Sequence, residues 1–261
     1  MMDYNFHAHT TRCGHATGKM EDYVLRAIEG GIRVMGFSDH VPLRFADGTE
    51  SGHRIPVAQA QDYYDEFITL REKYKDKIEL HIGFEVEYYP AYFEKTLADA
   101  RELGIEYFIL GQHFLSEENQ GGINSFAMHS DPAVIERFVS VLIAAMQTGR
   151  FTYVAHPDLL GFEGDASIYA RQMERLCLAS REMDVPLEIN LYGIRAKRRY
   201  PEERFWEIAG RIGAPVTFGC DAHSADAAAD PDSEAVAMRL VEKYGLNYIG
   251  KPKIVDIRKK G

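Results

Sequence analysis

Short apolar runs alternate with longer amphipathic stretches along the whole chain. Runs of four to eight mainly apolar residues, bounded by polar segments, indicate buried strands. We therefore expect seven strands, at residues 4–9, 34–40, 78–85, 107–113, 153–156, 186–191 and 215–221.

Apolar side chains at helical spacing predict helices between these strands. Tyr63, Phe67, Leu70 and Tyr74 recur every three or four residues, and the stretch 132–148 repeats that spacing. The expected helices cover residues 21–29, 59–74, 132–148, 201–211 and 231–244. We expect the basic segment 251–260 to be a solvated terminus.

Alternating strands and helices are typical of a parallel sheet covered by helices. Eight strand–helix units make the usual closed barrel, whereas seven are counted here. We predict a distorted seven-stranded (β/α)7 barrel, similar to a TIM barrel, formed as one domain by residues 1–261. A doubly wound open sheet is the alternative, although no glycine-rich phosphate loop follows the first expected strand.

Composition narrows the class of protein. The chain has 261 residues, 46% of them apolar, which excludes a wholly disordered chain. Its longest apolar run, residues 141–146, is too short to cross a bilayer, and the N-terminus lacks the pattern of a secretory signal. Three scattered cysteines do not indicate a disulfide framework. We expect a cytoplasmic protein, and the pattern leaves its oligomeric state open.

The chain is acidic, with a formal net charge of −10. Nucleic-acid binders usually carry a basic face, so we expect no nucleic-acid partner. An anionic substrate would therefore need a strongly positive local site.

Metal-binding residue types follow most of the expected strands. The C-terminal ends of parallel strands meet at one face of a barrel, so these side chains should converge. The strand-end residues are His7, His9, His40, Glu85, His113, His156, Asp221 and His223.

The spacing of two pairs supports a metal site. His7/His9 and Asp221/His223 are separated by two positions, which places their side chains on the same side of a strand. Neutral imidazoles and carboxylates are the expected ligands of zinc, manganese or iron. We interpret His53, His81 and His129 as ordinary polar residues, because they lie outside these strand ends.

These residues form a set that resembles the PHP (polymerase and histidinol phosphatase) superfamily. The matching segments are Phe6-His7-Ala8-His9-Thr10, His15, Ser38-Asp39-His40, Gly83-Phe84-Glu85, His113, His156-Pro157-Asp158 and Asp221-Ala222-His223. Cys13-Gly14-His15-Ala16, followed by Ser38 to Leu43, looks most like the monofunctional histidinol-phosphate phosphatases.

The resemblance implies three divalent metal ions (zinc, iron or manganese) at the C-terminal face of the barrel. It implies that His7 and His9 bind the first ion together with Glu85 and Asp221. Glu85 would bridge to a second ion, held also by His113 and His156. A third ion would be bound by His15, His40 and His223.

The implied activity is hydrolysis of a phosphate monoester, L-histidinol phosphate, to L-histidinol and phosphate in histidine biosynthesis. Three divalent ions with two carboxylates would leave a local charge of about +4, which suits a small phosphorylated substrate. Such a cluster activates water and stabilises both the attacking and the leaving oxygen.

The positions of further residues along the chain indicate their roles around the expected metal cluster. We assign catalytic roles to Glu85, Asp221, His223 and Asp39, although orientation of a ligand suits Asp39 or Asp158 better than proton relay. Arg195, which follows the sixth strand, is the first candidate for a phosphate contact. Arg12 and Arg44 are further candidates.

Three alternatives stay open. One is another phosphoesterase of the same superfamily: a nucleotide phosphodiesterase, a polymerase-associated exonuclease or a phosphotyrosine phosphatase. Another is a binuclear amidohydrolase, which also begins with His-x-His but often has a bridging lysine on strand four, where this chain has Gln112-His113. A structural metal scaffold is disfavoured, because structural zinc sites are closed four-ligand cages.

Overall fold

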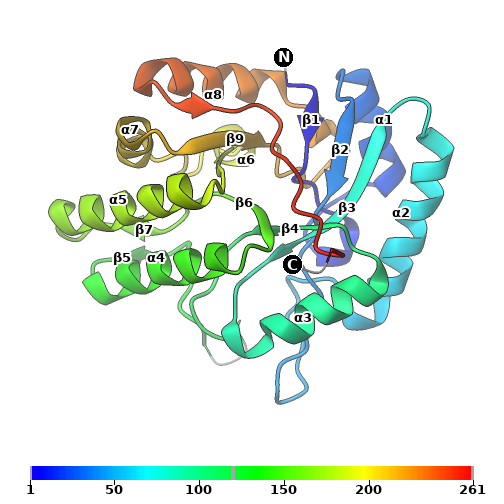
Figure 1. Cartoon of the computed structure of the whole chain (residues 1–261). Coiled ribbons are helices and arrows are strands. Elements are labelled where there is room, and N and C mark those ends of the chain that lie inside the picture. The colour runs from blue at the N-terminus through cyan, green and yellow to red at the C-terminus, as the bar shows by residue number, and fades with distance from the viewer. Residues whose placement is uncertain (1, 119–120, 260–261) are drawn as a thin grey trace.

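The computed structural model describes residues 2–118 and 121–259. Its main feature is one curled sheet of eight parallel strands in the order β1-β2-β3-β4-β6-β8-β9-β10 (Figure 1). The strands are β1 (Tyr4–Asn5), β2 (Val34–Phe37), β3 (Glu79–Val86), β4 (Tyr107–Leu110), β6 (Phe151–Val154), β8 (Leu187–Asn190), β9 (Pro215–Gly219) and β10 (Asn247–Tyr248). A separate two-stranded sheet pairs β5 (Met128–His129) with β7 (Gly161–Phe162).

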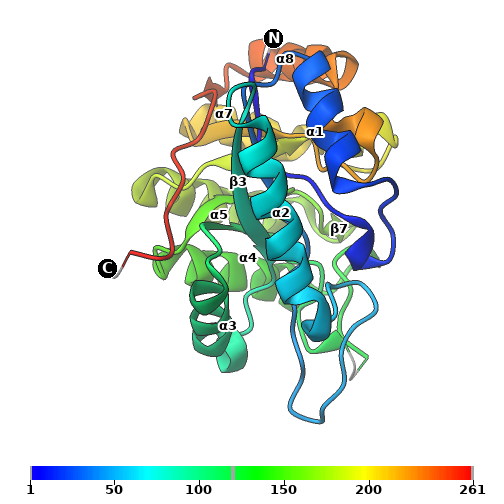
Figure 2. The ribbon, with the colours of Figure 1, turned by 90° about the vertical axis from the view of Figure 1, so that its right-hand side faces the viewer.

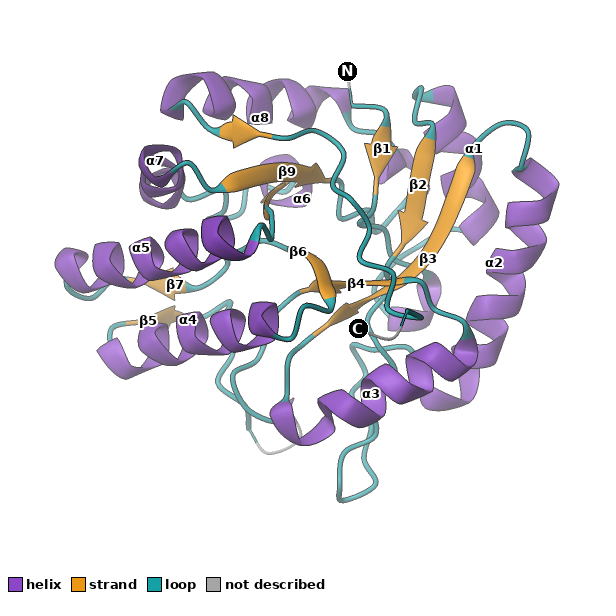
Figure 3. Cartoon of the chain, in the orientation of Figure 1, coloured by secondary structure: helices purple, strands orange, loops and turns teal. Residues whose placement is uncertain are grey.

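Helices cover the outer face of the curled sheet (Figure 3). They are α1 (Met20–Glu29), α2 (Ala60–Tyr74), α3 (Pro90–Leu103), α4 (Pro132–Gln147), α5 (Ala166–Met183), α6 (Leu191–Arg195), α7 (Glu203–Ile212) and α8 (Pro231–Tyr244). Their ends follow local rules: Asp131 accepts a hydrogen bond from the N–H of Ala133 at the start of α4, and Gly104 ends α3 in the left-handed region. No helix in the described part of the chain is both long and apolar enough to cross a membrane.

The barrel closes at only one end. Just beyond β1 and β9, Ala8 and Ala222 form a parallel bridge, with the N–H of His9 donating to Ala222 O at 2.9 Å. At the opposite end, β10 pairs with the beginning of β9, and the hydroxyls of Tyr4 and Tyr248 lie 3.1 Å apart. The seven strands that the pattern predicts thus form a distorted barrel, closed where its strands end.

Some details differ from the predicted fold. The sheet has an eighth strand, β10. Of the polar residues expected at the strand tips, Glu85 lies within β3, whereas the others follow the last residue of their strands. Similarly, α7 begins at Glu203 rather than at residue 201.

The C-terminal segment is not a solvated terminus. Ile257 is fully buried, and its N–H donates to Glu106 O at 2.9 Å. Its carbonyl accepts from Nε of Arg101 at 2.5 Å, and the N–H of Val255 donates to Thr152 Oγ1 at 3.2 Å. Figures 1 and 2 show this segment crossing the end of the barrel where the strands begin, on the side away from the loop after β1.

We predict that Ile257→Ala lowers the free energy of unfolding by about 2–5 kcal/mol, because it leaves a cavity at the base of the barrel. Urea denaturation measures this loss. Lys253→Ala, at an exposed position of the same segment, should change stability by less than about 0.5 kcal/mol. An equally small effect of Ile257→Ala would mean that the segment does not pack as described.

Candidate metal centre

The nine residues with implied ligand roles come together at the end of the barrel where the strands finish. All of them lie in or just after a strand or in the loop after β1. Eight of them line a cavity of about 560 Å³, and His7 lies beneath it with its ring 5.2 Å from that of His9. The eight are His9, His15, His40, Glu85, His113, His156, Asp221 and His223.

In four atoms of this set, each of two carboxylate oxygens lies close to both of two imidazole nitrogens. Glu85 Oε2 lies 3.5 Å from Nε2 of both His7 and His9. Asp221 Oδ1 lies 3.5 Å and 3.2 Å from the same two nitrogens. A tetrahedral ion with ligands at about 2.0–2.1 Å separates those ligands by about 3.3–3.4 Å. The arrangement therefore fits an ion of the size of zinc.

Unpaired atoms support the same interpretation. His7 Nε2, His9 Nε2 and Asp221 Oδ1 are buried and have no hydrogen-bond partner among the described residues. Buried polar atoms are normally paired, so exceptions need an explanation. A cation among these three atoms would provide one.

The second oxygen of Glu85 faces another pair of imidazoles. Glu85 Oε1 lies 2.9 Å from His156 Nε2 and 3.5 Å from His113 Nε2. One carboxylate therefore reaches two candidate ion positions, one with each oxygen.

A third group of candidate ligands consists of three histidines, and it lies nearer the cavity than the group around His7 and His9. The imidazole nitrogens of His15, His40 and His223 lie within 4.8 Å of one another. His15 is exposed, and its Nδ1 lies 2.8 Å from the carbonyl of Cys13, which leaves Nε2 as the free nitrogen. This group is the most accessible of the three.

Electrostatics at the centre favour a cation. Burial raises the pKa of Glu85, but the surrounding imidazoles, His113 and His7 first, hold it well below its usual range. Burial lowers the pKa of His7, yet Glu188, Asp221 and Glu85 together raise it to about 10. The carboxylates around His7 therefore favour a positive charge there, and a bound metal cation would supply that charge in place of a proton.

His40 behaves differently. Burial, with the neighbouring imidazoles of His9 and His113, holds its pKa well below the usual value although Glu85 opposes them. It is therefore neutral near pH 7, which is the form of imidazole that binds metal.

Two residues of β8 support the centre and were missed by the sequence analysis. Glu188 Oε1 lies 2.8 Å from His7 Nδ1, and Asn190 Nδ2 donates to Asp221 Oδ2 at 3.1 Å. A carboxylate behind a ligating histidine fixes its tautomer and orientation. Their signal was available, since both are polar residues two positions apart in an otherwise apolar expected strand.

Carboxylates also stand behind two other imidazoles. Glu87 Oε1 lies 2.6 Å from His113 Nδ1, and Asp39 Oδ1 lies 3.4 Å from His9 Nδ1. Asp39 is fully buried, accepts hydrogen bonds from Thr10 and from the N–H of His40, and is not among the residues that line the cavity. It is placed to orient His9, which is the role that the sequence analysis favoured for it over proton relay, and its catalytic role stays a prediction.

The backbone around the ligands is shaped for close approach. His156 and Asp221 have φ angles of 33° and 47°, a left-handed conformation that is costly for residues with a side chain. The N–H of His156 is held by Glu188 Oε2 at 3.1 Å. At Gly111, a Cβ atom would lie 1.9 Å from Glu85 Oε1, so a larger residue would displace that carboxylate.

None of the three arginines expected at the phosphate lines the cavity above the histidines. Arg195 pairs with Asp230 at 2.5 Å and donates to the carbonyls of Cys220 and Asp221, so it braces the backbone of a candidate ligand. Arg12 pairs with Glu66 at 2.7 Å.

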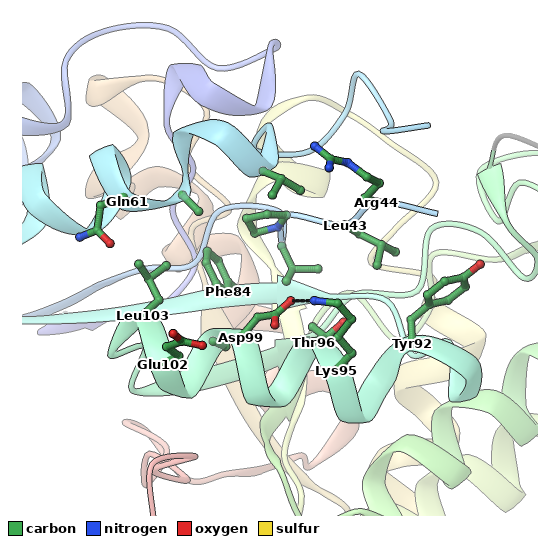
Figure 4. A pocket seen from close by; sticks show the side chains of 15 residues that line it. Leu43, Arg44, Gln61, Phe84, Tyr92, Lys95, Thr96, Asp99, Glu102 and Leu103 are labelled. Carbon is green, nitrogen blue, oxygen red and sulfur yellow. Dashed lines mark hydrogen bonds and ion pairs between the residues drawn. The ribbon is translucent and has the colours of Figure 1, made fainter. Parts of the chain in front are cut away.

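Arg44 pairs with Glu50 and lines a second cavity, of about 530 Å³, between the loop after β2 and α3 (Figure 4). None of the nine candidate ligands lines that second cavity.

Asp158 is also placed away from the ligands. Its Oδ2 accepts hydrogen bonds from the N–H of Glu202 at 2.7 Å and from Trp206 Nε1 at 2.9 Å. Burial raises its pKa to about 7. Asp158 therefore anchors the start of α7, which corrects the expectation that it orients a ligand.

Several residues that line the cavity were not among the candidates chosen from the strand ends. His53 lines the cavity, contrary to its interpretation as an ordinary loop residue, whereas His81 pairs with Glu106 and Glu79 near the opposite end of the barrel. Phe126 is 44% exposed and stacks on the ring of His113 at 5.4 Å. Other lining residues are Arg54, Phe114, Glu118, Asn124, Tyr192, Arg198 and Tyr200.

Comparison with known proteins places this centre in a family context. A profile of the PHP domain matches residues 5–191. The chain is 24% identical, over 229 residues, to a probable histidinol-phosphatase of Deinococcus radiodurans, covering 83% of this chain and 85% of that protein. It is 25% identical, over 248 residues, to the histidinol-phosphatase of Bacillus subtilis, covering 84% and 92%.

Among solved structures, the chain resembles histidinol phosphate phosphatase from Lactococcus lactis, which was crystallised with zinc, L-histidinol and phosphate. The TM-score is 0.71 with 17% identity, over 96% of this chain and 98% of that chain. At this identity the likeness shows that the two chains share a fold, and it confirms the predicted barrel-like α/β architecture.

We predict that Glu188→Gln lowers metal affinity about 10–100-fold, because the neutral amide holds His7 less firmly in the ligating orientation. Competition with a chromophoric chelator measures this change. Glu174→Gln, at an exposed position paired with Arg211, is the matched control and should leave the affinity unaltered. Equal affinities for Glu188→Gln and the unmodified protein would show that Glu188 does not support the centre.

Proposed function

The chain belongs to the PHP domain family, and we propose that it is a metal-dependent phosphatase that hydrolyses L-histidinol phosphate to L-histidinol and phosphate. The observation that carries the metal dependence is the close approach, 3.2–3.5 Å, of carboxylate oxygens from Glu85 and Asp221 to the buried Nε2 atoms of His7 and His9. The names of the relatives support the choice of substrate.

We assign three divalent ions to the centre. His7, His9, Glu85 and Asp221 would hold the first, and Glu85, His113 and His156 the second. His15, His40 and His223 would hold the third, on the cavity side. When bound, such ions lower the pKa of water and stabilise charge on attacking and leaving oxygens.

The residues of the chain position the reactants. Glu85 joins the first two groups through its two oxygens, so it fixes their separation. The accessible third group would orient the oxygens of a phosphate dianion. Arg198, which lines the cavity and lies 3.0 Å from Tyr192 Oη, replaces Arg195 as the candidate phosphate contact.

The cavity walls fit a small substrate with a planar ring. Phe114, Phe126, Tyr192 and Tyr200 present aromatic surface beside the histidines. An imidazole could pack against such faces. Phosphotyrosine also carries a ring, so it is the alternative substrate that this cavity leaves open, whereas the net charge of −10 disfavours polynucleotides.

We predict that treatment with a chelator abolishes phosphate release from L-histidinol phosphate and that added zinc or manganese restores it. With metal present, kcat/KM for this ester should exceed that for phosphotyrosine and AMP by at least about tenfold, since the cavity discriminates by its contacts with the alcohol half. Measuring phosphate release from these three esters tests both the metal dependence and the substrate preference. Activity that survives metal removal contradicts the metal dependence, and a preference for phosphotyrosine or AMP contradicts the assigned substrate.

We also predict that Arg198→Ala lowers kcat/KM by about 10–100-fold, because a hydrogen bond to a charged group contributes about 1.5–3 kcal/mol. Steady-state kinetics test this. Arg12→Ala, whose guanidinium pairs with Glu66, should retain the kinetic constants of the unmodified enzyme. The assignment is wrong if the two variants behave alike.

A further inference from the structure

Two long loops build the cavity walls, and one side chain joins them. Arg54 belongs to the segment between β2 and α2, and Glu118 belongs to the segment after β4. The Arg54 side chain is only 3% exposed, and its NH2 group lies 2.7 Å from Glu87 Oε2 and 2.5 Å from Glu118 Oε1. Arg54 also donates to the carbonyl of Val41 at 3.4 Å.

The same contacts reach the metal centre. Glu87 uses one oxygen for Arg54 and the other for His113 Nδ1, at 2.6 Å. His113 Nε2 in turn faces Glu85 Oε1 at 3.5 Å. A continuous series of contacts therefore leads from the loop after β4, through Arg54 and Glu87, to a candidate metal ligand.

We propose that Arg54 is a positioning residue: it fixes Glu87 so that His113 presents Nε2 to the ion shared with Glu85 and His156, and it ties both loops to that geometry. This inference rests on the proposed metal centre, and it concerns Arg54 and Glu118, to which no role has been assigned above.

The residue type and its burial support this role. A buried ion pair contributes little to stability in general, because desolvation offsets the attraction, so its presence here calls for another benefit. Arginine has a rigid planar fork that can bind two carboxylates at once, which the single ammonium group of lysine does less well. A fixed Glu87 gives His113 one tautomer and one orientation.

The charge balance guides the choice of variant. Arg54→Met alone would leave Glu87 and Glu118 buried without their counter-charge, and the protein could fail to fold. The double variant Arg54→Met/Glu118→Gln removes one positive and one negative charge, so the net charge of the cluster is unchanged while the link to Glu87 is lost. Glu118→Gln alone keeps the ion pair between Arg54 and Glu87.

The experiment measures bound metal per chain by elemental analysis, and zinc affinity by chelator competition, on the full-length protein. We expect Arg54→Met/Glu118→Gln to weaken one class of zinc site about 10–100-fold while the others persist. Glu118→Gln should retain all of them. Arg71→Met, which breaks a partly exposed pair with Glu106 far from the cavity, is the control and should also retain them.

A double-mutant cycle separates positioning from general destabilisation. Glu87→Gln should weaken the same zinc site, and adding Arg54→Met/Glu118→Gln to it should cause little further loss, since both changes break one linkage. Additive losses, or loss of all zinc sites together with a lowered Tm, would overturn the proposal. So would full zinc affinity in the Arg54 variant.

The outcome is distinguishable from that of the proposed function. A protein that shows the selective zinc effect but does not hydrolyse L-histidinol phosphate retains the role of Arg54 and loses the assigned substrate. A protein that hydrolyses the ester while its Arg54 variant binds zinc normally keeps the function and loses the positioning role.

Discussion

Two carboxylates, Glu85 and Asp221, are buried at the centre of a group of imidazoles, and the architecture of the site follows from the need to balance their charge. A buried carboxylate without a positive partner is costly. The surrounding histidines hold the pKa of both carboxyl groups well below the usual range despite burial. The low pKa favours the ionised form of both groups, and the nitrogens facing them lie where a bound cation would contact both.

Around this centre, several imidazoles are held from behind by an oxygen. Glu188, Glu87 and Asp39 lie behind His7, His113 and His9, and the carbonyl of Cys13 lies behind His15. These three carboxylates make the local charge less positive than the figure of about +4 that two carboxylates alone would leave. Arg54 and Glu118, which pair beside Glu87, add no net charge to this sum.

Closure of the barrel at one end brings candidate ligands from distant strands together. The bridge between Ala8 and Ala222 brings the segments after β1 and β9 together, and these carry His7, His9, Asp221 and His223. The positive φ angles of His156 and Asp221 concentrate backbone strain in the same region. Glu188 accepts a hydrogen bond from the N–H of His156 there, and Arg195 donates one to the carbonyl of Asp221. The opposite end of the barrel, which the C-terminal segment covers, contributes packing rather than candidate ligands.

The sequence pattern predicted the seven main strands and the place of eight of the nine candidate ligands, and the family resemblance added His15. This was possible because alternation and strand-end position depend on local order along the chain, and parallel strands then bring their ends together whatever the details. It could not determine which arginine reaches the cavity, because a long side chain can pair with residues far away in sequence: Arg195 pairs with Asp230, and Arg12 with Glu66.

Tertiary structure alone decided the supporting contacts. Glu188 and Asn190 act on ligands from other strands, and their contacts depend on the register of β8 against its neighbours. Burial of Ile257 depends on a surface that exists only after the barrel has formed. Local pattern fixes which elements form, whereas the pairing of side chains depends on distances that only the assembled sheet sets.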